Sequence, residues 1–320
     1  MPVRVAVLDD YQGVARRFGP WERLGDAIDL HVFRDHVADD DALVERLKGF
    51  EVVVAMRERT PFPRERLRRL GALRLLVTTG MVNASIDLDA AREQGIVVAG
   101  TGGVAGSTVE LTWALILAVT RHVCAEDGAI RAGGWQHTIG PELAGRTLGV
   151  VGLGRLGSRV ATIGRAFEME VVAWSENLRA ERAAALGVEA VGKEELLERA
   201  DVVTIHQRLS ERTRGLIGAA ELARMRPTAY LVNTSRGPIV DEAALLAALR
   251  EGTIAGAALD VYDVEPLPAG HPLRSAPNTV LTPHIGYVST GSYSVYYRDA
   301  VEDIEAWLRG APMRVLDAGG

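Results

Sequence analysis

Short runs of Val, Ile and Leu alternate with longer amphipathic stretches along almost the whole chain, and this alternation constrains the fold more than any other feature. Continuous apolar runs are typical of strands buried on both faces of a parallel sheet, and apolar residues at helical spacing indicate covering helices. The sequence therefore predicts an α/β fold with doubly wound parallel sheets. The predicted strands are residues 3–9, 28–33, 51–56, 73–79 and 95–100 in a first series, and 147–152, 170–174, 201–205, 229–233, 256–260 and 279–282 in a second.

A glycine-rich patch, GTGGVAGSTVE, separates the two series and leads into a long apolar helix predicted from about Ser107 to Arg131. A chain of 320 residues suggests about two domains. The last predicted helix, near Ser294 to Leu308, is amphipathic, and we expect it to fold back onto the first domain. We therefore predict a discontinuous first domain of residues 1–101 plus 286–320, and a second domain of residues 102–285.

Charge and cysteine content narrow the function classes. A net charge of −6 and a pI near 5.7 argue against a nucleic-acid-binding surface and favour small-molecule chemistry. The single cysteine, Cys124, excludes an internal disulfide, and we expect it to pack in the core. Arg121 interrupts the apolar run around it, and the N-terminus carries two acids where a signal peptide would be apolar. We expect a cytoplasmic protein without a membrane span, and without a metal, because no histidine pair has metal-ligand spacing.

Three glycines give the sharpest local signal. Gly152, Gly154 and Gly157 follow an apolar strand and open a helix, in the stretch VVGLGRLGSRVA. Glycines in this order allow a tight turn, close approach of a pyrophosphate and helix packing on the strand, while the helix N-terminus attracts the phosphates. The strand, turn, helix, strand order predicts a dinucleotide site, with a purely structural glycine turn as the alternative.

The next strand ends where dinucleotide-binding folds commonly place a carboxylate for the adenosine ribose. Ser175 stands at that position and Glu176 follows it. Glu176 could accept from the ribose and would repel a 2′-phosphate, whereas Arg179 could attract one. We therefore predict NAD as the cofactor and leave NADP open. A solvated Glu176 is the alternative.

Three residues with charged or titratable side chains follow strands of the second series. Arg236 follows the strand 229–233, Glu265 lies beyond the strand 256–260, and His284 follows the strand 279–282. Any one of them alone is more often structural or solvated. Because the carboxyl ends of parallel strands meet at one edge of a sheet, the three could converge over a nicotinamide.

Taken together, these segments resemble the D-isomer-specific 2-hydroxyacid dehydrogenase family. The resemblance rests on GLGRLGSRVA, NTSRG around Arg236, ALDVYDVEP around Glu265 and TPHIGY around His284, and it extends over essentially the whole chain. It implies a flavodoxin-like substrate domain and a Rossmann cofactor domain with a cleft between them. It also implies hydride transfer between NAD(H) and C2 of a small 2-hydroxy or 2-oxo acid.

The same resemblance implies a role for each matching residue. Arg236 would bind the substrate carboxylate and C2 oxygen, His284 would be the acid/base, and Glu265 would hydrogen-bond the imidazole and favour its charged form. The implied cofactor contacts are Thr108, Gly152, Gly154, Arg155, Leu156, Gly157, Ser175, Glu176, His206, Thr234, Asp260 and Gly286. The implied substrate contacts are Gly80, Met81 and Arg57, with Arg59 nearby. For Arg57 and Arg59 a solvated charge is an equal alternative.

Some positions depart from the family pattern. Ser175 replaces the usual ribose Asp, Arg208 stands where a proline is usual, and Gly100 and Gly102 replace Asn and Pro near the interdomain hinge.

The family is commonly dimeric. The helix near Glu110 to Val123 and the segment around Trp135 are therefore candidate contact surfaces. A buried intradomain helix is the alternative. A dinucleotide-sensing interaction protein, like the C-terminal-binding-protein corepressors that resemble this family, is the second functional hypothesis.

Overall fold

A computed structural model describes residues 1–317 of the chain. Packing divides the chain into two compact units. Unit 1 is Met1–Val104 together with the chain from Ser289 onward, and unit 2 is Ala105–Val288. These divisions fall three residues beyond each boundary that the sequence suggested.

Unit 1 is built on a five-stranded, fully parallel sheet in the order β2-β1-β3-β4-β5. All five strands predicted for the first series are present. The central strands β3 and β4 are buried along their whole length because continuous Val and Leu runs have helices on both faces, whereas the edge strand β2 has no fully buried residue. The strands are β1 (Val3–Val7), β2 (Ile28–Val32), β3 (Val52–Ala55), β4 (Leu75–Thr78) and β5 (Val97–Gly100).

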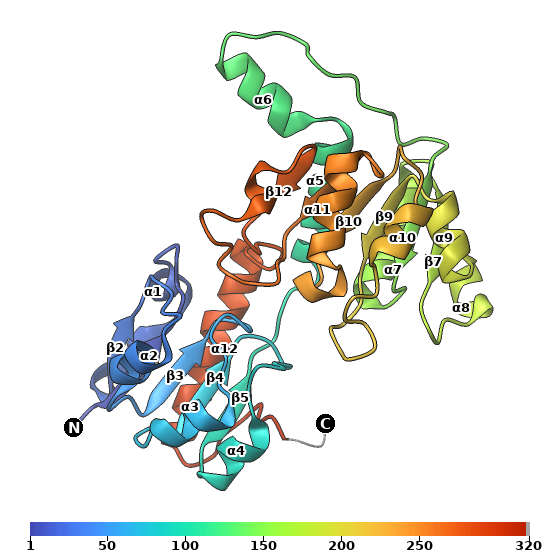
Figure 1. Ribbon diagram of the computed structural model, residues 1–320. Helices are drawn as coiled ribbons and strands as arrows, with labels where there is room; N and C mark the ends of the chain where they lie inside the picture. The colour runs from blue at the N-terminus through green and yellow to red at the C-terminus, as the bar shows by residue number, and fades with distance from the viewer. Residues whose placement is uncertain (318–320) are drawn as a thin grey trace. The chain divides into compact units, whose positions relative to one another are not determined.

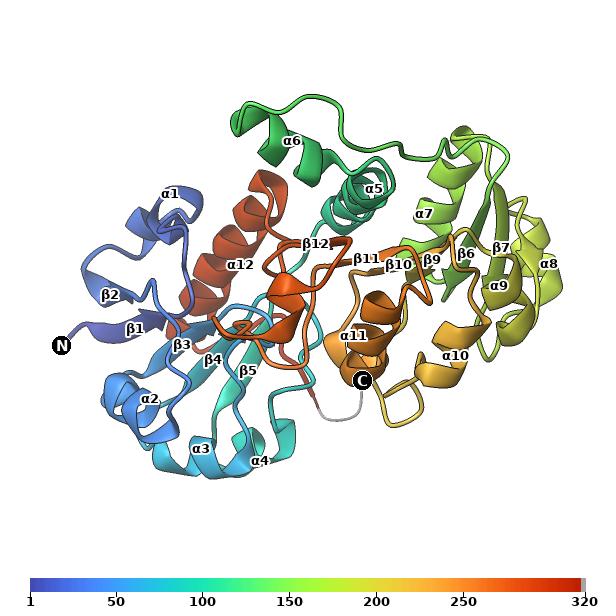
Figure 2. The ribbon, with the colours of Figure 1, turned by 45° about the horizontal axis from the view of Figure 1, so that its top comes forward.

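The helices of unit 1 lie on both sides of this sheet (Figure 1). They are α1 (Ala15–Phe18), the 3-10 segment η1 (Trp21–Ala27), α2 (Asp40–Leu47), α3 (Arg64–Arg69), α4 (Leu88–Glu93) and α12 (Thr290–Leu308). In Figure 2, α12 lies on one face and α2, α3 and α4 lie on the other. Ser289 caps α12 by accepting from the Ser292 amide at 3.2 Å. Tyr293, Tyr296 and Tyr297 of α12 are buried, so this helix completes the core of unit 1.

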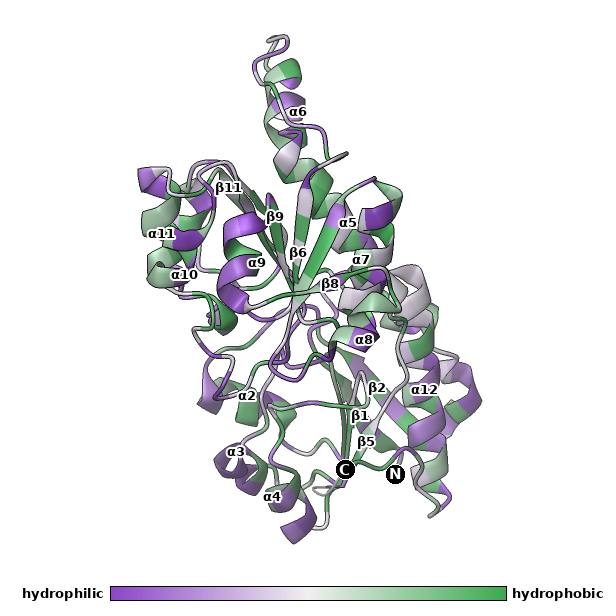
Figure 3. Cartoon of the chain, turned by 90° about the vertical axis from the view of Figure 1, so that its right-hand side faces the viewer, coloured by the Kyte–Doolittle hydropathy of each residue, from purple (hydrophilic) through white to green (hydrophobic). Residues whose placement is uncertain are grey.

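Unit 2 contains a seven-stranded parallel sheet in the order β12-β11-β10-β9-β6-β7-β8. Six strands match the second predicted series, and the additional β8, at the sheet edge, has only two residues. The strands are β6 (Thr147–Val151), β7 (Glu170–Trp174), β8 (Glu189–Ala190), β9 (Val202–Ile205), β10 (Tyr230–Asn233), β11 (Gly256–Leu259) and β12 (Thr279–Leu281). Figure 3 shows hydrophobic residues gathered in its central strands and in α5.

Helices α5 and α7 pack on one face of this sheet, whereas α9, α10 and α11 follow one another along the other. The helical segments of unit 2 are α5 (Gly106–Thr120), α6 (Val123–Arg131), α7 (Arg155–Ala166), α8 (Ala180–Ala184), α9 (Lys193–Arg199), α10 (Ala219–Arg224), η2 (Gly237–Ile239), α11 (Glu242–Glu251) and η3 (Pro272–Ser275).

The single long helix predicted from Ser107 to Arg131 is wrong, because the chain breaks between α5 and α6. His122 adopts a left-handed conformation with φ of 52°, which ends the helical hydrogen-bonding pattern. No residue of α6 is buried, and Cys124 on it is exposed, so the predicted core position of this cysteine is also wrong. No single helix in residues 1–317 meets the length and hydropathy needed to cross a membrane; α5 and α6 meet them only as a pair bent by 63°.

Candidate active site

Three neighbouring strands of unit 2, β10, β11 and β12, end in loops that carry the predicted reactive residues. Nδ1 of His284 lies 2.5 Å from Oε2 of Glu265, and both side chains are mostly buried, at 17% and 27% exposure. Arg236 is half-buried, and its charge acts on the same carboxylate. The structure therefore brings Glu265 and His284 into direct contact, although 19 residues separate them in sequence.

Glu265 is held as a carboxylate by its surroundings. Burial by itself raises its pKa, but the hydrogen bond and charge of His284, the Tyr262 amide at 3.0 Å and the charge of Arg236 outweigh burial. The net result is a pKa below the usual value for a glutamate. An anionic Glu265 fixes a proton on Nδ1 of His284, which leaves Nε2 as the ring atom that can exchange a proton.

His284 sits in a strained turn. Its φ is 54°, in the left-handed region that a residue with a side chain adopts only when the surroundings enforce it. Its amide donates to the carbonyl of Thr282 two residues earlier, at 3.0 Å. The ring of Tyr287 meets the imidazole edge to face, with centroids 5.6 Å apart. The imidazole is thus fixed by its own backbone and by two neighbouring side chains.

The carboxylate of Asp260 holds the loop that carries His284. Oδ1 accepts from Thr282 Oγ1 at 2.6 Å and from the Ile285 amide at 2.8 Å, and Oδ2 accepts from the Gly286 amide at 2.8 Å. Burial raises the pKa of Asp260, although these hydrogen bonds and the charge of His284 act in the opposite direction. Asp260, which the sequence suggested as a cofactor contact, supports the His284 turn through these bonds.

The Arg236 loop is fixed by side chains at the end of β10. Asn233 donates from Nδ2 to the Arg236 carbonyl at 2.9 Å and accepts from the Ser235 amide at 3.0 Å. Ser235 donates from Oγ to the Ile205 carbonyl at 2.7 Å, and Arg236 donates from Nη1 to the Ser235 carbonyl at 2.7 Å. Bonds of this kind limit where the guanidinium can reach.

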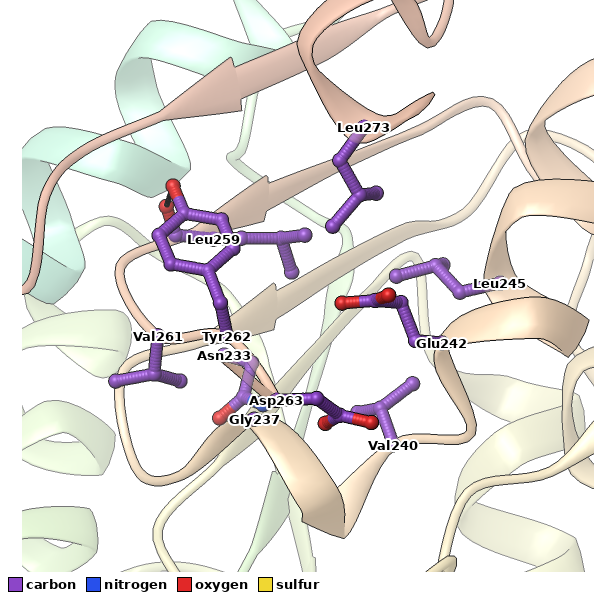
Figure 4. Close-up of a pocket in the computed structure, with 10 residues that line it drawn as sticks. All are labelled: Asn233, Gly237, Val240, Glu242, Leu245, Leu259, Val261, Tyr262, Asp263 and Leu273. Atoms are coloured by element: carbon purple, nitrogen blue, oxygen red, sulfur yellow. Dashed lines mark hydrogen bonds between the residues drawn. The ribbon is translucent and has the colours of Figure 1, made fainter. Parts of the chain in front are cut away.

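Gly237 lets the Arg236 loop lie against the Glu265 loop. A Cβ at this position would stand 2.1 Å from the carbonyl carbon of Tyr262, so only glycine fits. Figure 4 shows the packed region behind the two loops, where a cavity of about 10 Å³ has room for roughly one water molecule. Its lining residues are Asn233, Gly237, Val240, Glu242, Leu245, Leu259, Val261, Tyr262, Asp263 and Leu273.

The three predicted glycines form the turn between β6 and α7. Gly152 has a φ of 104°, and a Cβ there would meet the His206 carbonyl oxygen at 2.5 Å. A Cβ at Gly157 would lie 2.0 Å from the Gly152 carbonyl oxygen, whereas one at Gly154 would meet no atom within 4 Å. Arg155 and Leu156 open the 12-residue helix α7. Open space before a helix N-terminus fits a dinucleotide pyrophosphate.

Two alanine substitutions are expected to separate packing from ligand approach. Gly157→Ala should lower the thermal unfolding midpoint, because a Cβ there would clash with the Gly152 carbonyl and overpacking typically costs about 1–3 kcal/mol. Gly154→Ala should unfold like the wild type but bind NADH at least about tenfold more weakly, equivalent to ~1.4 kcal/mol. Thermal unfolding and NADH fluorescence titration measure the two effects. Equal NADH affinity in Gly154→Ala and wild type would contradict the expectation that a pyrophosphate occupies the open space at Gly154.

The remaining predicted cofactor residues of unit 2 lie around the same sheet edge. Thr108 donates to the Gly286 carbonyl at 3.0 Å, and Thr234 shares a 2.9 Å hydroxyl contact with Thr112. Nε2 of His206 lies 3.0 Å from Thr204 Oγ1, and burial lowers the pKa of His206 to about 4. Nδ1 of His206 is buried and has no hydrogen-bond partner among residues 1–317, which fits a site completed by a ligand.

Ser175 and Glu176 lie directly after β7. Ser175 is half-buried, and its carbonyl accepts from the Leu178 amide at 2.9 Å. Glu176 is exposed, and so are Arg179 and Arg208, the two cations that could favour a 2′-phosphate. The segment after β7 therefore presents Glu176 and Arg179 to solvent, and the segment after β9 presents Arg208.

Arg57, Gly80 and Met81 belong to unit 1. Arg57 has a φ of 54°, and its Nη1 donates to the Thr79 carbonyl at 3.1 Å. The Gly80 amide, predicted to meet a substrate carboxylate, donates to Thr101 Oγ1 at 2.8 Å. Met81 is exposed by 47%. Gly80 has a φ of 99°, a left-handed conformation that residues with a side chain rarely adopt, so glycine is favoured there.

Asn233, Tyr262 and Thr282 are structurally central but were not predicted. A polar side chain at the end of a buried strand was the available signal for Asn233 and Thr282. Tyr262 gave only an aromatic residue close to a strand end, which is more often plain core. Residues 1–317 contain no group of three or more His, Cys, Asp or Glu side chains able to hold a metal ion.

Comparison with known proteins identifies the fold and the chemistry. The family model described as D-isomer specific 2-hydroxyacid dehydrogenase, NAD binding domain, matches residues 113–286. A glyoxylate reductase from Aeropyrum pernix is 43% identical over 248 residues, covering 74% of this chain and 74% of that protein. A D-3-phosphoglycerate dehydrogenase from Bacillus subtilis is 34% identical over 287 residues, covering 89% of this chain and 54% of that protein.

A solved structure gives the same answer over nearly the whole chain. The phosphoglycerate oxidoreductase from Vibrio cholerae o395 has a TM-score of 0.92 and 38% identity, covering 97% of this chain and 100% of that chain. Its similarity extends over both units. With more than half of its length matched by the family's cofactor domain and with relatives this similar, the chain belongs to the D-isomer-specific 2-hydroxyacid dehydrogenase family, as an NAD-dependent enzyme.

Proposed function

We propose that the protein reduces a small 2-oxo acid, such as glyoxylate or hydroxypyruvate, with Arg236, Glu265 and His284 as the reactive set. The observation that carries this proposal is the 2.5 Å contact between His284 and Glu265 on loops next to the Arg236 loop. Relatives named glyoxylate reductase support the substrate class.

Each residue has a chemical task in this proposal. When bound, NADH supplies the hydride that turns the C2 carbonyl into an alcoholate and is left as NAD⁺. His284 gives its Nε2 proton to that oxygen, and Glu265 stabilises the imidazolium before the transfer. Arg236 binds the carboxylate and the C2 oxygen, because a guanidinium presents several donors in one plane.

For the cofactor we propose contacts from Thr108, Thr234, His206, Asp260 and Gly286 beside the glycine turn. Ser175 and Glu176 would meet the ribose, with NAD favoured by the Glu176 carboxylate. In unit 1 we retain Arg57, Gly80 and Met81 as proposed substrate contacts.

A substrate panel tests the proposal. Purified protein is expected to oxidise NADH faster than NADPH with 2-oxo acids of graded side-chain length. Acetone serves as the control, because it offers a carbonyl but no carboxylate for Arg236. No turnover with any 2-oxo acid, despite NADH binding, would instead favour the dinucleotide-sensing hypothesis.

We also propose a homodimer formed through the arm, defined as residues 122–140. Helix α5 packs inside unit 2, whereas α6 projects from it (Figure 3). The arm exposes Val123, Ile130, Trp135 and Ile139 by 52%, 54%, 73% and 97%, a large apolar surface for a monomer. Sedimentation at micromolar concentration checks this, with a shift to monomer expected for the double variant Trp135→Ser, Ile139→Ser. The prediction of a cytoplasmic location rests on the sequence alone.

A further inference from the structure

Tyr262 joins the loops that carry all three proposed reactive residues. Its amide donates to Oε1 of Glu265 at 3.0 Å, and its backbone packs against Gly237 next to Arg236. Its hydroxyl lies 2.9 Å from the carbonyl of Thr282, two residues before His284. Tyr262, which lies three positions after the end of β11, thus contacts the loops that follow β10, β11 and β12.

The phenol of Tyr262 is committed to this contact. The ring is 7% exposed, and the hydroxyl points to the carbonyls of Leu259 at 3.2 Å and of Thr282 at 2.9 Å. Because a hydroxyl has one proton, the shorter contact is the better hydrogen bond. The ring borders the cavity in Figure 4, whose volume of about 10 Å³ is too small to let an aromatic ring move far. Burial, together with the charges of Asp260 and Glu265, raises the pKa of Tyr262, which keeps the phenol protonated as a donor.

The Thr282 carbonyl links this phenol to the strained turn. It accepts both the Tyr262 hydroxyl and the His284 amide, the latter at 3.0 Å. A left-handed residue with a side chain costs on the order of 1–2 kcal/mol, so the turn persists only while neighbours hold it. The Asp260 carboxylate and the Tyr262 phenol are side chains outside the turn that hydrogen-bond to it.

We propose that Tyr262 is a positioning residue, whose hydroxyl holds the His284 turn so that the imidazole stays on Glu265. The inference rests on the proposed function for its kinetic consequence, but the placement of the imidazole can be measured without substrate. Loss of the hydroxyl leaves Thr282 with one donor instead of two. The turn then loosens, and His284 spends less time against Glu265.

The charged groups around His284 determine how this loosening is detected. The acidic groups in this cluster are Glu265 and Asp260, and the basic group is Arg236. Tyr287 contributes an uncharged ring. Of these, Glu265 is in direct contact with the imidazole, at Nδ1. A looser contact therefore weakens the hydrogen bond between Nδ1 and Glu265, whereas loss of a buried hydroxyl elsewhere in unit 2 leaves that hydrogen bond unchanged.

The test compares Tyr262→Phe with Tyr230→Phe in the full chain. Tyr230 is also buried in unit 2, at 6% exposure, but it begins β10 at the end opposite Asn233. The Nδ1 proton of His284, which lies in the hydrogen bond to Glu265, is followed by NMR, and its signal is assigned by its absence from His284→Gln. The same proteins are assayed for kcat, for KM of the 2-oxo acid and for NADH affinity.

For Tyr262→Phe we expect the Nδ1 proton signal of His284 to move upfield and to exchange faster with water, and kcat to fall about tenfold, within the range that misplacement of a reacting group can cost. NADH affinity should stay within about twofold, because the glycine turn is untouched. Tyr230→Phe should match the wild type. An unchanged Nδ1 proton signal in folded Tyr262→Phe overturns the inference. A changed signal in a protein that reduces no 2-oxo acid supports the inference and refutes the proposed function instead.

Discussion

His284→Gln is expected to lower kcat by about 100-fold to 10,000-fold, the usual contribution of a general acid/base, while NADH affinity changes little. Glutamine keeps a polar group near Glu265 but cannot donate a proton of suitable acidity. Steady-state reduction of the best 2-oxo acid and fluorescence titration with NADH measure the two quantities. A loss of NADH affinity as large as the loss of kcat would move His284 from proton transfer to cofactor binding.

His31→Gln is the matched control for this variant. His31 also contacts a carboxylate, with Nε2 2.8 Å from Asp29 Oδ2, but its side chain is 40% exposed in unit 1.

The rate at which the wild type reduces the 2-oxo acid should fall as pH rises, because the protonated imidazole of His284 is the proton donor in that direction. His206 does not produce this dependence, since burial lowers its pKa to about 4 and keeps it neutral near pH 7.

Arg236→Lys is expected to reduce kcat/KM by about 100-fold to 10,000-fold, from the loss of about two charge-assisted hydrogen bonds of ~1.5–3 kcal/mol each. Lysine keeps the charge but offers a single ammonium in place of a planar fork. The same assay with acetone should lose far less, because acetone has no carboxylate. Arg250→Lys, on the exposed end of α11, should behave like the wild type. Equal losses with both carbonyl compounds would show that Arg236 does not recognise the carboxylate.

The parallel strands could be predicted well because their signal is local. Runs such as EVVVAM and DVVTI are too apolar to be anything but buried strands in an α/β chain, and both are present as β3 and β9. By contrast, β8 has two residues and no such run, so it gave no signal. The break at His122 depends on one backbone conformation, and the helical periodicity continues across it.

The candidate site could be predicted in its members but not in its contacts. Strand-end logic placed Glu265 and His284 at one sheet edge, yet only coordinates give the 2.5 Å contact between them. The hydrogen bonds that Asp260 accepts from the His284 loop depend on how that loop turns, which sequence spacing does not encode. The same holds for the Gly80 amide, whose acceptor Thr101 lies 21 residues away on a different loop.

Unit 1 is formed by two segments that lie far apart in the sequence, and this affects the order in which the two units can fold during synthesis. The ribosome releases β1 to β5 first, but the core of unit 1 lacks the buried tyrosines of α12 until the last part of the chain emerges. Unit 2 is continuous, so it can complete its own core earlier, as domains folding during synthesis do. Released chains truncated before Thr290 should therefore protect unit 2 from protease while the N-terminal segment is still cut.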